Sequence, residues 1–344
     1  MSKILITGAA GFIGSQLAYR LWKDKNEIVL IDNFSYGSKD NLIFEDVDFQ
    51  NIILNIDVRD KKSIDDLYER EKFDYIYHIA GITPLPDCQV DPAEAVAVNV
   101  MGTVNILEAG RKYGVKKIIF ASTSAVYENN IDFPSTEEYV IPPSLIYPNT
   151  KYTAERYCQA YADTYGMSIV CMRFANVYGP HIDCLRKQPP VIGYLIREYY
   201  YDRQPILHST GEQRRDFVYV DDLIELALKV QEGTGYDVVN VSTNTTHTIN
   251  ELAEIVAGLM GKDNIHPLYV SSSHYWEKYP ELYQGAYPIS KDKLEQEVVK
   301  FTQLSNEHAY QRYGWKPVVD LKEGIEKTME FSLKILNNQS NNIL

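Results

Sequence analysis

Hydrophobic residues recur along the first half of the chain in two alternating patterns. Short continuous apolar runs are separated by longer segments in which apolar residues return every three or four positions. The runs predict strands that are buried on both faces, and the longer segments predict helices. The predicted strands cover residues 3–8, 27–32, 52–58, 75–81, 116–122 and 168–179, and the helices cover residues 12–24, 61–72, 93–114 and 147–166.

Strands that alternate with helices in this way predict an α/β fold, a Rossmann-type doubly wound parallel sheet with helices on both faces. From about residue 180 Pro, Tyr and polar residues become more frequent and the strands shorten. We therefore expect a Rossmann domain over residues 1–179 and a smaller C-terminal α+β domain over residues 180–336, with segments such as 216–230 crossing back to the main sheet. The polar residues 337–344 predict a disordered tail.

Charge, apolar runs and cysteine spacing limit which binding partners and which location we expect for this protein. The chain of 344 residues has a net charge of −13, which disfavours a general role on nucleic acid or on an anionic membrane. No signal-peptide layout opens the chain, and no apolar run reaches membrane-spanning length. Cys88, Cys158, Cys171 and Cys184 are scattered, so we expect no disulfide, no metal site and a cytoplasmic location.

A glycine-rich turn lies between the first predicted strand and its helix. Gly8, Gly11 and Gly14 are spaced as GxxGxxG. Glycines here allow a tight turn and a close approach to a pyrophosphate, which the free N–H groups of the helix N-terminus can bind. The turn therefore predicts a dinucleotide site.

Two carboxylates follow the next strands. Asp32 ends the second strand, 18 residues after Gly14. A carboxylate at this point binds the ribose hydroxyls and repels a 2′-phosphate, so NAD is favoured over NADP. Asp57 ends the third strand, where it could either approach the adenine or cap the following helix.

A tyrosine and a lysine begin the last predicted helix of the Rossmann half. Tyr147 and Lys151 are four positions apart and share one helix face, and Thr123 follows the fifth strand. An adjacent ammonium and a cationic nicotinamide would favour the phenolate of Tyr147. That phenolate could remove a hydroxyl proton while Thr123 hydrogen bonds the same oxygen.

These residues carry a resemblance. The set "TGAAGFIG", Asp32, "HIAG", "NVMGTVNIL", "STSAVY", "YPNTK", "RFANVYGP" and "RRDFVYVDDL" resembles the extended short-chain dehydrogenase/reductase family, and within it the nucleotide-sugar epimerases and dehydratases. The resemblance implies an enzyme with bound NAD, a nucleotide-diphosphate sugar as substrate, a substrate-binding C-terminal domain, and a homodimer formed through the helices at residues 93–113 and 148–165.

The resemblance also assigns further contacts. Besides the glycines, Asp32, Asp57, Tyr147 and Lys151, it implies cofactor contacts from Phe12, Ile13, Asn33, Val58, Ala80 and Asn99. Substrate contacts are implied for Thr123, Ser124, Asn176 and Arg215. An arginine suits the diphosphate because its guanidinium binds phosphate in a bidentate manner.

The two residues after Thr123 help to decide which reaction the enzyme catalyses. The resembling 4,6-dehydratases carry Asp-Glu directly after the catalytic Thr, and UDP-glucuronate decarboxylases carry Glu two residues after it, whereas this chain has Ser124 and Ala125. We therefore expect a C4 epimerase acting on a UDP-sugar, in which C4 is oxidised, the 4-keto sugar rotates, and reduction occurs on the opposite face with no net consumption of NAD.

Alternatives and departures from the pattern remain. A dehydratase, decarboxylase or 4-keto reductase could take its acid from elsewhere, for example Glu128, which replaces the glycine usual after "VY"; a non-catalytic nucleotide-binding scaffold is a third interpretation. The late arginine of these families is not evident, and Lys291 or Lys293 could replace it. Arg186 and Lys187 either cover the nucleotide or form a solvated basic loop.

Overall fold

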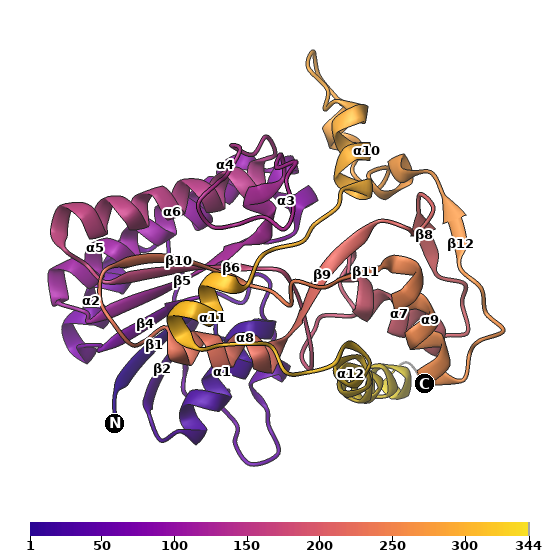
Figure 1. The fold of residues 1–344 in the computed structure, drawn as a ribbon. Coiled ribbons are helices and arrows are strands. Elements are labelled where there is room, and N and C mark those ends of the chain that lie inside the picture. The colour runs from indigo at the N-terminus through magenta and orange to yellow at the C-terminus, as the bar shows by residue number, and fades with distance from the viewer. Residues whose placement is uncertain (343–344) are drawn as a thin grey trace.

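The computed structural model describes residues 1–342 and contains the predicted doubly wound Rossmann sheet (Figure 1). Seven parallel strands lie in the order β10-β6-β5-β4-β1-β2-β3. They are β1 (Lys3–Thr7), β2 (Glu27–Asp32), β3 (Ile53–Asn55), β4 (Tyr75–His78), β5 (Lys117–Thr123), β6 (Ile169–Phe174) and β10 (Tyr236–Val241).

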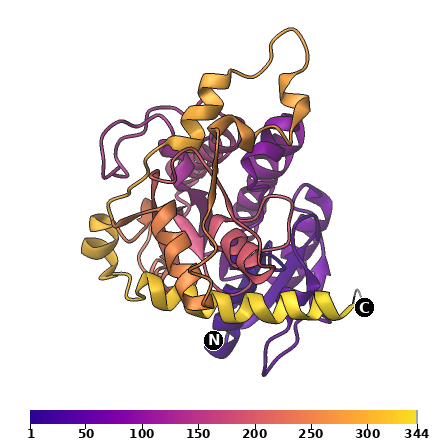
Figure 2. The same ribbon diagram turned by 90° about the vertical axis from the view of Figure 1, so that its right-hand side faces the viewer.

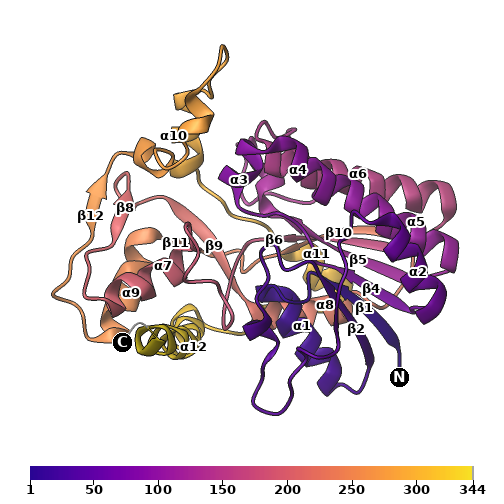
Figure 3. The same cartoon turned by 180° about the vertical axis from the view of Figure 1, so that it is seen from behind.

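Helices cover both faces of this sheet (Figures 1 and 3). Successive side chains of a strand point to opposite faces, so Ile4 and Ile6 of β1 join one core cluster and Leu5 joins another. One face is covered by α1 (Phe12–Lys23) and α8 (Val220–Lys229), and the other by α2 (Lys61–Glu71), α5 (Thr103–Tyr113) and α6 (Ile146–Tyr165). Continuous apolar strands are needed because neither face meets solvent.

Two predicted elements are divided in the structure. The predicted helix over residues 93–114 consists of α4 (Pro92–Val96), a π-helical stretch (Ala97–Gly102) and α5. The predicted strand over residues 168–179 splits into β6 and β7 (Asn176–Tyr178), which belong to different sheets. The side-chain amide of Asn176 donates to the carbonyl of Asp216 at 2.9 Å and ties β7 to the second sheet. Apolar residues continue from β6 into β7, so hydrophobicity does not show that the predicted strand is divided between two sheets.

The second sheet and its helices form the C-terminal part. The sheet has the order β11-β9-β7, and β12 pairs with β8 beside it. Helices α7, α9 and α12 pack together, with α12 running along one side of the molecule (Figure 2). The elements are α7 (Val191–Tyr200), β8 (Ile206–His208), β9 (Arg214–Tyr219), β11 (Thr246–Thr248), α9 (Ile249–Met260), β12 (Leu268–Val270) and α12 (Leu321–Asn342).

The chain crosses back to the main sheet twice after residue 179. Of the segment 216–230, β9 stays in the second sheet while α8 packs beside α1. The hydroxyl of Tyr77 on β4 donates to the carbonyl of Ala227 on α8 at 3.0 Å. β10 follows α8 directly and adds to the sheet edge in the same crossing. The second crossing brings α11 (Glu307–Tyr313) against β10.

The C-terminal helix continues past residue 336, where the sequence predicted a disordered tail. α12 runs to Asn342. Leu336 is buried, and Asn337 accepts a hydrogen bond of 2.6 Å from the hydroxyl of Tyr200 on α7. These tertiary contacts stabilise a polar stretch that composition alone marks as disordered; residues 343 and 344 of the predicted tail lie outside the described residues.

An insertion with its own small core projects beside the Rossmann sheet (Figures 1 and 3). It contains the short helices η4 (Ser272–Tyr275) and η5 (Pro280–Tyr283) and the helix α10 (Lys291–Val299). Trp276, Tyr279, Leu282 and Leu294 form its core. η5 contacts α3 (Leu85–Val90) of the Rossmann half. Within residues 1–342, none of the helices combines the length and apolar character that a membrane crossing requires.

A buried ion pair joins α6 to the sheet. Arg173 on β6 contacts Glu155 on α6 with nitrogen–oxygen distances of 2.7 and 2.9 Å, and both side chains are almost fully buried. Ser122 on β5 donates to the same carboxylate at 2.5 Å, and Arg173 donates to the hydroxyl of Tyr127 at 2.7 Å. The two charges and their neighbours are therefore hydrogen bonded to one another.

Replacing Arg173 with Met should destabilise the fold by roughly 3–5 kcal/mol, because the Glu155 carboxylate would be left buried without its counter-charge. Equilibrium denaturation in urea would measure the loss. Lys62→Ala breaks the solvent-exposed pair with Asp66 and should leave the stability almost unchanged, because water and salt screen surface ion pairs. Equal losses in the two variants would contradict this account of the buried pair.

Candidate active site

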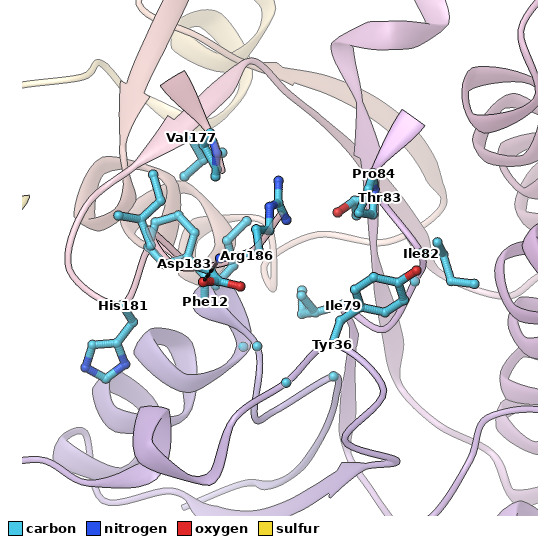
Figure 4. Close-up of a pocket in the computed structure, with 18 of the residues that line it drawn as sticks. Phe12, Tyr36, Ile79, Ile82, Thr83, Pro84, Val177, His181, Asp183 and Arg186 are labelled. Atoms are coloured by element: carbon cyan, nitrogen blue, oxygen red, sulfur yellow. Dashed lines mark hydrogen bonds between the residues drawn. The ribbon is translucent and has the colours of Figure 1, made fainter. Parts of the chain in front are cut away.

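A cavity of about 1280 Å³ opens at the carboxyl ends of the central strands (Figure 4). This is the edge at which ligands bind in open α/β sheets. Most of the residues predicted from the sequence line it. These are Gly8, Gly11, Phe12, Ile13, Gly14, Asp32, Asn33, Val58, Ala80, Thr123, Tyr147, Lys151 and Asn176.

The glycine turn leaves no room for side chains. Gly8 has φ +68°, and a Cβ on it would lie 2.7 Å from the backbone nitrogen of Ala80. A Cβ on Gly14 would lie 2.1 Å from the carbonyl oxygen of Gly8. α1 starts directly after the turn, and its N-cap residue Gly11 provides no side-chain cap. The N-terminus of α1 therefore presents N–H groups and positive potential to the cavity.

Asp32 is held against the glycine turn. Its carboxylate accepts hydrogen bonds from the backbone N–H groups of Ala10 at 2.9 Å and Phe34 at 2.7 Å. Burial raises the pKa of this carboxyl, and the two backbone hydrogen bonds oppose the rise. Asp32 is thus fixed at the strand end where the sequence predicted ribose recognition.

Asp57 contacts Asn33 and Arg59 and does not cap α2. It does not line the cavity within the described residues, and α2 is capped by Asp60. Asp57 instead accepts a hydrogen bond of 2.8 Å from the side-chain amide of Asn33 and pairs with Arg59, which lowers its pKa to about 2. Its effect on the cavity is to orient Asn33.

Asn99 and Ser124 also lie outside the cavity lining. Asn99 is buried in the π-helical stretch, where its side chain accepts from the backbone N–H of Ile82 at 2.8 Å and donates to the same residue's carbonyl at 3.0 Å. It also donates to the hydroxyl of Thr150 on α6 at 3.0 Å. Asn99 therefore braces the loop after β4 against α6, a contact between distant segments that the sequence does not reveal.

Thr123, Tyr147 and Lys151 converge at the end of β5. Lys151 donates to the carbonyl of Ala121 at 3.0 Å, and Thr123 hydrogen bonds the phenol of Tyr147. Burial lowers the pKa of Lys151 to about 8 and raises the pKa of Tyr147 to about 12, with the Thr123 hydrogen bond opposing the latter shift. The protein groups alone therefore keep Tyr147 a neutral phenol, and a phenolate would form only if further positive charge were brought near it.

Of the two residues predicted to contact the diphosphate, one lines the cavity and the other does not. Asn176 lines the cavity, but Arg215 does not. The guanidinium of Arg215 donates to the backbone carbonyls of Val298 at 3.0 Å and Glu297 at 3.4 Å, and burial lowers its pKa to about 10. Lys293, a suggested substitute for the late arginine, pairs with Glu128 instead.

Segments distant in sequence meet around the cavity. Arg186 and Lys187 line it, as does Tyr36 from the loop after β2. In Figure 4 Arg186 lies on the side of Asp183 and Val177, opposite Tyr36 and the residues after β4. Tyr36 donates to the carboxylate of Asp87 on α3 at 3.0 Å. The sequence pattern does not single out Tyr36 or Asp87; the available signal is an aromatic residue between Asp32 and Gly37.

The comparisons with known proteins bear on this site. Residues 4–242 match the model of the NAD dependent epimerase/dehydratase family. The chain belongs to that family. It is therefore an enzyme of the extended short-chain dehydrogenase/reductase branch, as the sequence motifs predicted.

Proteins similar to this chain are named for different activities within the family. A putative UDP-glucose 4-epimerase of Methanocaldococcus jannaschii is 32% identical, over 95% of this chain and 97% of the relative. UDP-glucuronic acid decarboxylase 1 of Xenopus tropicalis is 30% identical, over 99% and 74%. The crystal structure of UDP-glucose 4-epimerase from Thermotoga maritima with UDP-glucose has a TM-score of 0.85 at 28% identity and covers 97% of this chain, with 99% of that chain matched.

The residues of this cavity fit NAD, the cofactor of the family. The glycine turn is so tight that a Cβ on Gly8 or Gly14 would collide with neighbouring backbone. The turn, the N-terminus of α1 and Asp32 all line the cavity. The turn and helix suit the pyrophosphate, and the carboxylate suits a ribose without a 2′-phosphate.

Gly14→Ala should weaken NAD binding at least about tenfold, which corresponds to only about 1.4 kcal/mol. The added Cβ would displace the backbone of Gly8 from its position beside the pyrophosphate. Calorimetric titration with NAD would measure the effect. Gly258→Ala in α9 is the control, because its Cβ would meet nothing closer than 3.7 Å. Unchanged affinity in a folded Gly14→Ala variant would contradict the assignment of this turn.

Proposed function

We propose that the protein is an NAD-dependent UDP-sugar 4-epimerase. The observation that carries the proposal is the placing of Tyr147 and Thr123 together in the cavity, with Ser124 and Ala125 at the positions where dehydratases and decarboxylases would carry an acid. Oxidation and reduction at one sugar carbon need no further acid. Likeness to UDP-sugar 4-epimerases over almost the whole chain supports the same choice.

In this proposal Tyr147 moves the proton at the sugar O4. Bound NAD supplies the reversible oxidation of the sugar carbon. Thr123 donates to or accepts from the same oxygen and holds it at the phenol. Lys151, one helical turn after Tyr147, contributes positive potential when protonated, and its bond to the carbonyl of Ala121 keeps it in place.

The positive charge needed to stabilise the Tyr147 phenolate can be estimated from the pKa of the phenol. Lowering its pKa from about 12 to near neutrality takes roughly 7 kcal/mol of preferential stabilisation of the phenolate. One unit charge ~5 Å away supplies about 3 kcal/mol at an effective dielectric constant of 20. A single cation is therefore insufficient, and the phenolate requires Lys151, the bound cofactor and the Thr123 hydrogen bond together.

In this proposal Asn176 and Arg215 bind the diphosphate of the nucleotide sugar. Asn176 already lines the cavity. For Arg215 to reach the diphosphate, its guanidinium must exchange the carbonyls of Glu297 and Val298 for phosphate oxygens, which are stronger acceptors because they are charged. Arg186 and Lys187 also line the cavity and could add positive charge for the diphosphate.

The alternative in which Glu128 supplies a dehydratase or decarboxylase acid has little support. Its carboxylate is only 3% exposed, is paired with Lys293, and accepts a hydrogen bond from the backbone of Leu145 at 3.1 Å. Glu128 is not among the residues that line the cavity. A carboxylate held in this way is aimed at the protein and not at a sugar.

The reaction is tested by incubating the pure protein with a panel of UDP-sugars and analysing the products by NMR and mass spectrometry. We expect an equilibrium mixture of C4 epimers with no change in mass and no net NADH. Tyr147→Phe should lower turnover by roughly 10²–10⁴-fold with nucleotide binding little changed, since only the proton-transferring hydroxyl is lost. Loss of water or carbon dioxide, or full activity of Tyr147→Phe, would refute the proposal.

We also propose that the protein forms a homodimer through the helices around α5 and α6. Apolar side chains are exposed on these elements, among them Val96, Met101, Tyr157 and Tyr165. Light scattering at micromolar concentration should give the mass of a dimer. Met101→Glu should shift it toward the monomer, whereas Val318→Glu, at an exposed apolar residue after α11, should not. A monomeric wild-type protein would refute this proposal.

A further inference from the structure

The helix that carries Tyr147 has no N-terminal cap of its own. α6 begins at Ile146, and its N-cap residue is Leu145, whose side chain cannot accept a hydrogen bond. Two side chains from other segments accept the free backbone N–H groups instead. Glu128 accepts from Leu145 and Gln89 accepts from Ile146, each at 3.1 Å. The first turn of α6 is therefore held by residues distant in sequence.

Glu128 ends the same short segment that contacts the phenol of Tyr147. Thr123 at the end of β5 hydrogen bonds the phenol, η3 (Ser124–Tyr127) follows, and Glu128 is the C-cap residue of η3. This segment holds Tyr147 at its hydroxyl through Thr123 and at the backbone of Leu145 through Glu128. A carboxylate at a helix N-terminus also interacts favourably with the helix dipole.

A lysine from the insertion provides the counter-charge of Glu128. Lys293 of α10 pairs with the buried carboxylate of Glu128 and donates to the side-chain oxygen of Asn129 at 3.0 Å. Asn129 in turn donates to the carbonyl of Pro142 at 2.7 Å and to the hydroxyl of Ser144 at 3.0 Å. A buried carboxylate without a counter-charge is strongly unfavourable, so Glu128 depends on Lys293 and α10 is tied to the approach to α6.

The other end of α10 contacts a second part of the site. The carbonyls of Glu297 and Val298 in its last turn accept hydrogen bonds from Arg215. The C-terminus of a helix carries partial negative charge, which suits a guanidinium. One helix of the insertion thus contacts both Glu128 and Arg215.

We propose that Glu128 is a positioning residue for Tyr147 and that Lys293 is its partner, so that α10 sets the geometry of the catalytic phenol. The inference rests on the proposed role of Tyr147 in the proposed function. Proton transfer needs heavy atoms roughly 2.6–3.2 Å apart, and a displacement of ~1 Å can cost about 10²-fold in rate. A shift of the first turn of α6 would move the phenol away from Thr123 without removing any group that touches the substrate.

A graded series of variants tests this inference. Glu128→Ala removes both contacts and should lower kcat about 100-fold, whereas Glu128→Gln keeps an acceptor for Leu145 and should lower it about 10-fold, as should Lys293→Met. KM for the UDP-sugar should change less than about threefold. The double variant Glu128→Ala/Lys293→Met should be no slower than Glu128→Ala, because the two residues act as one unit.

Glu198→Gln is the matched control. Glu198 is a buried glutamate on α7 that pairs with Arg203 at 2.8 Å and does not line the cavity. Its kcat should stay within about twofold of the wild type at a similar change in melting temperature. Thermal unfolding of every variant identifies any that fail to fold, and Glu128→Gln and Lys293→Met remain informative where Glu128→Ala does not fold.

The outcomes separate this inference from the proposed function. Unchanged kcat in a folded Glu128→Ala variant, or an equal loss in Glu198→Gln, would overturn the inference while epimerisation by the wild type stands. If the wild type instead catalyses another reaction that Tyr147→Phe abolishes, the proposed function fails, and the same ordering of kcat on that reaction still supports the inference. Turnover that does not depend on Tyr147 would overturn both.

Discussion

The ion pair between Glu155 and Arg173 fixes the helix of Tyr147 and Lys151 against the strands of the sheet. Its carboxylate also accepts from Ser122, the neighbour of Thr123, so the pair connects the two elements that bear the site. A buried pair of this kind stabilises the fold only while both partners remain and are fully hydrogen bonded. The geometry of the cavity therefore depends on two charged residues that do not line it.

Burial has opposite effects on the two titratable groups of the site. It raises the pKa of Tyr147 to about 12 and lowers that of Lys151 to about 8, because an apolar environment disfavours the charged form of each. Without ligand, the phenol is neutral and the ammonium titrates near physiological pH. In the proposed mechanism the active protonation state then forms only in the loaded enzyme, which restricts proton removal to a bound substrate.

The insertion between β12 and α11 contacts the site from outside the Rossmann sheet. It has its own core, and its helix α10 contacts Arg215 through backbone carbonyls and Glu128 through Lys293. The buried carboxylate of Glu128 requires a counter-charge, and Lys293 of the insertion provides it. Glu128, which departs from the family pattern, and Lys293, suggested as a substitute for the late arginine, thus belong to one structural feature.

Local sequence patterns determined most of the Rossmann half, because buried parallel strands, glycine turns and helix starts each impose a short-range residue pattern. The glycine turn, Asp32, and the combination of Thr123, Tyr147 and Lys151 were predicted in this way, and the structure places all of them around one cavity. Tertiary structure alone decided that Asn99 and Asp57 brace neighbouring residues, that Arg215 bonds to α10, and that Tyr36 meets Asp87. Each of these depends on which distant segments pack together, and contacts at long sequence separation leave no periodic signal in the chain.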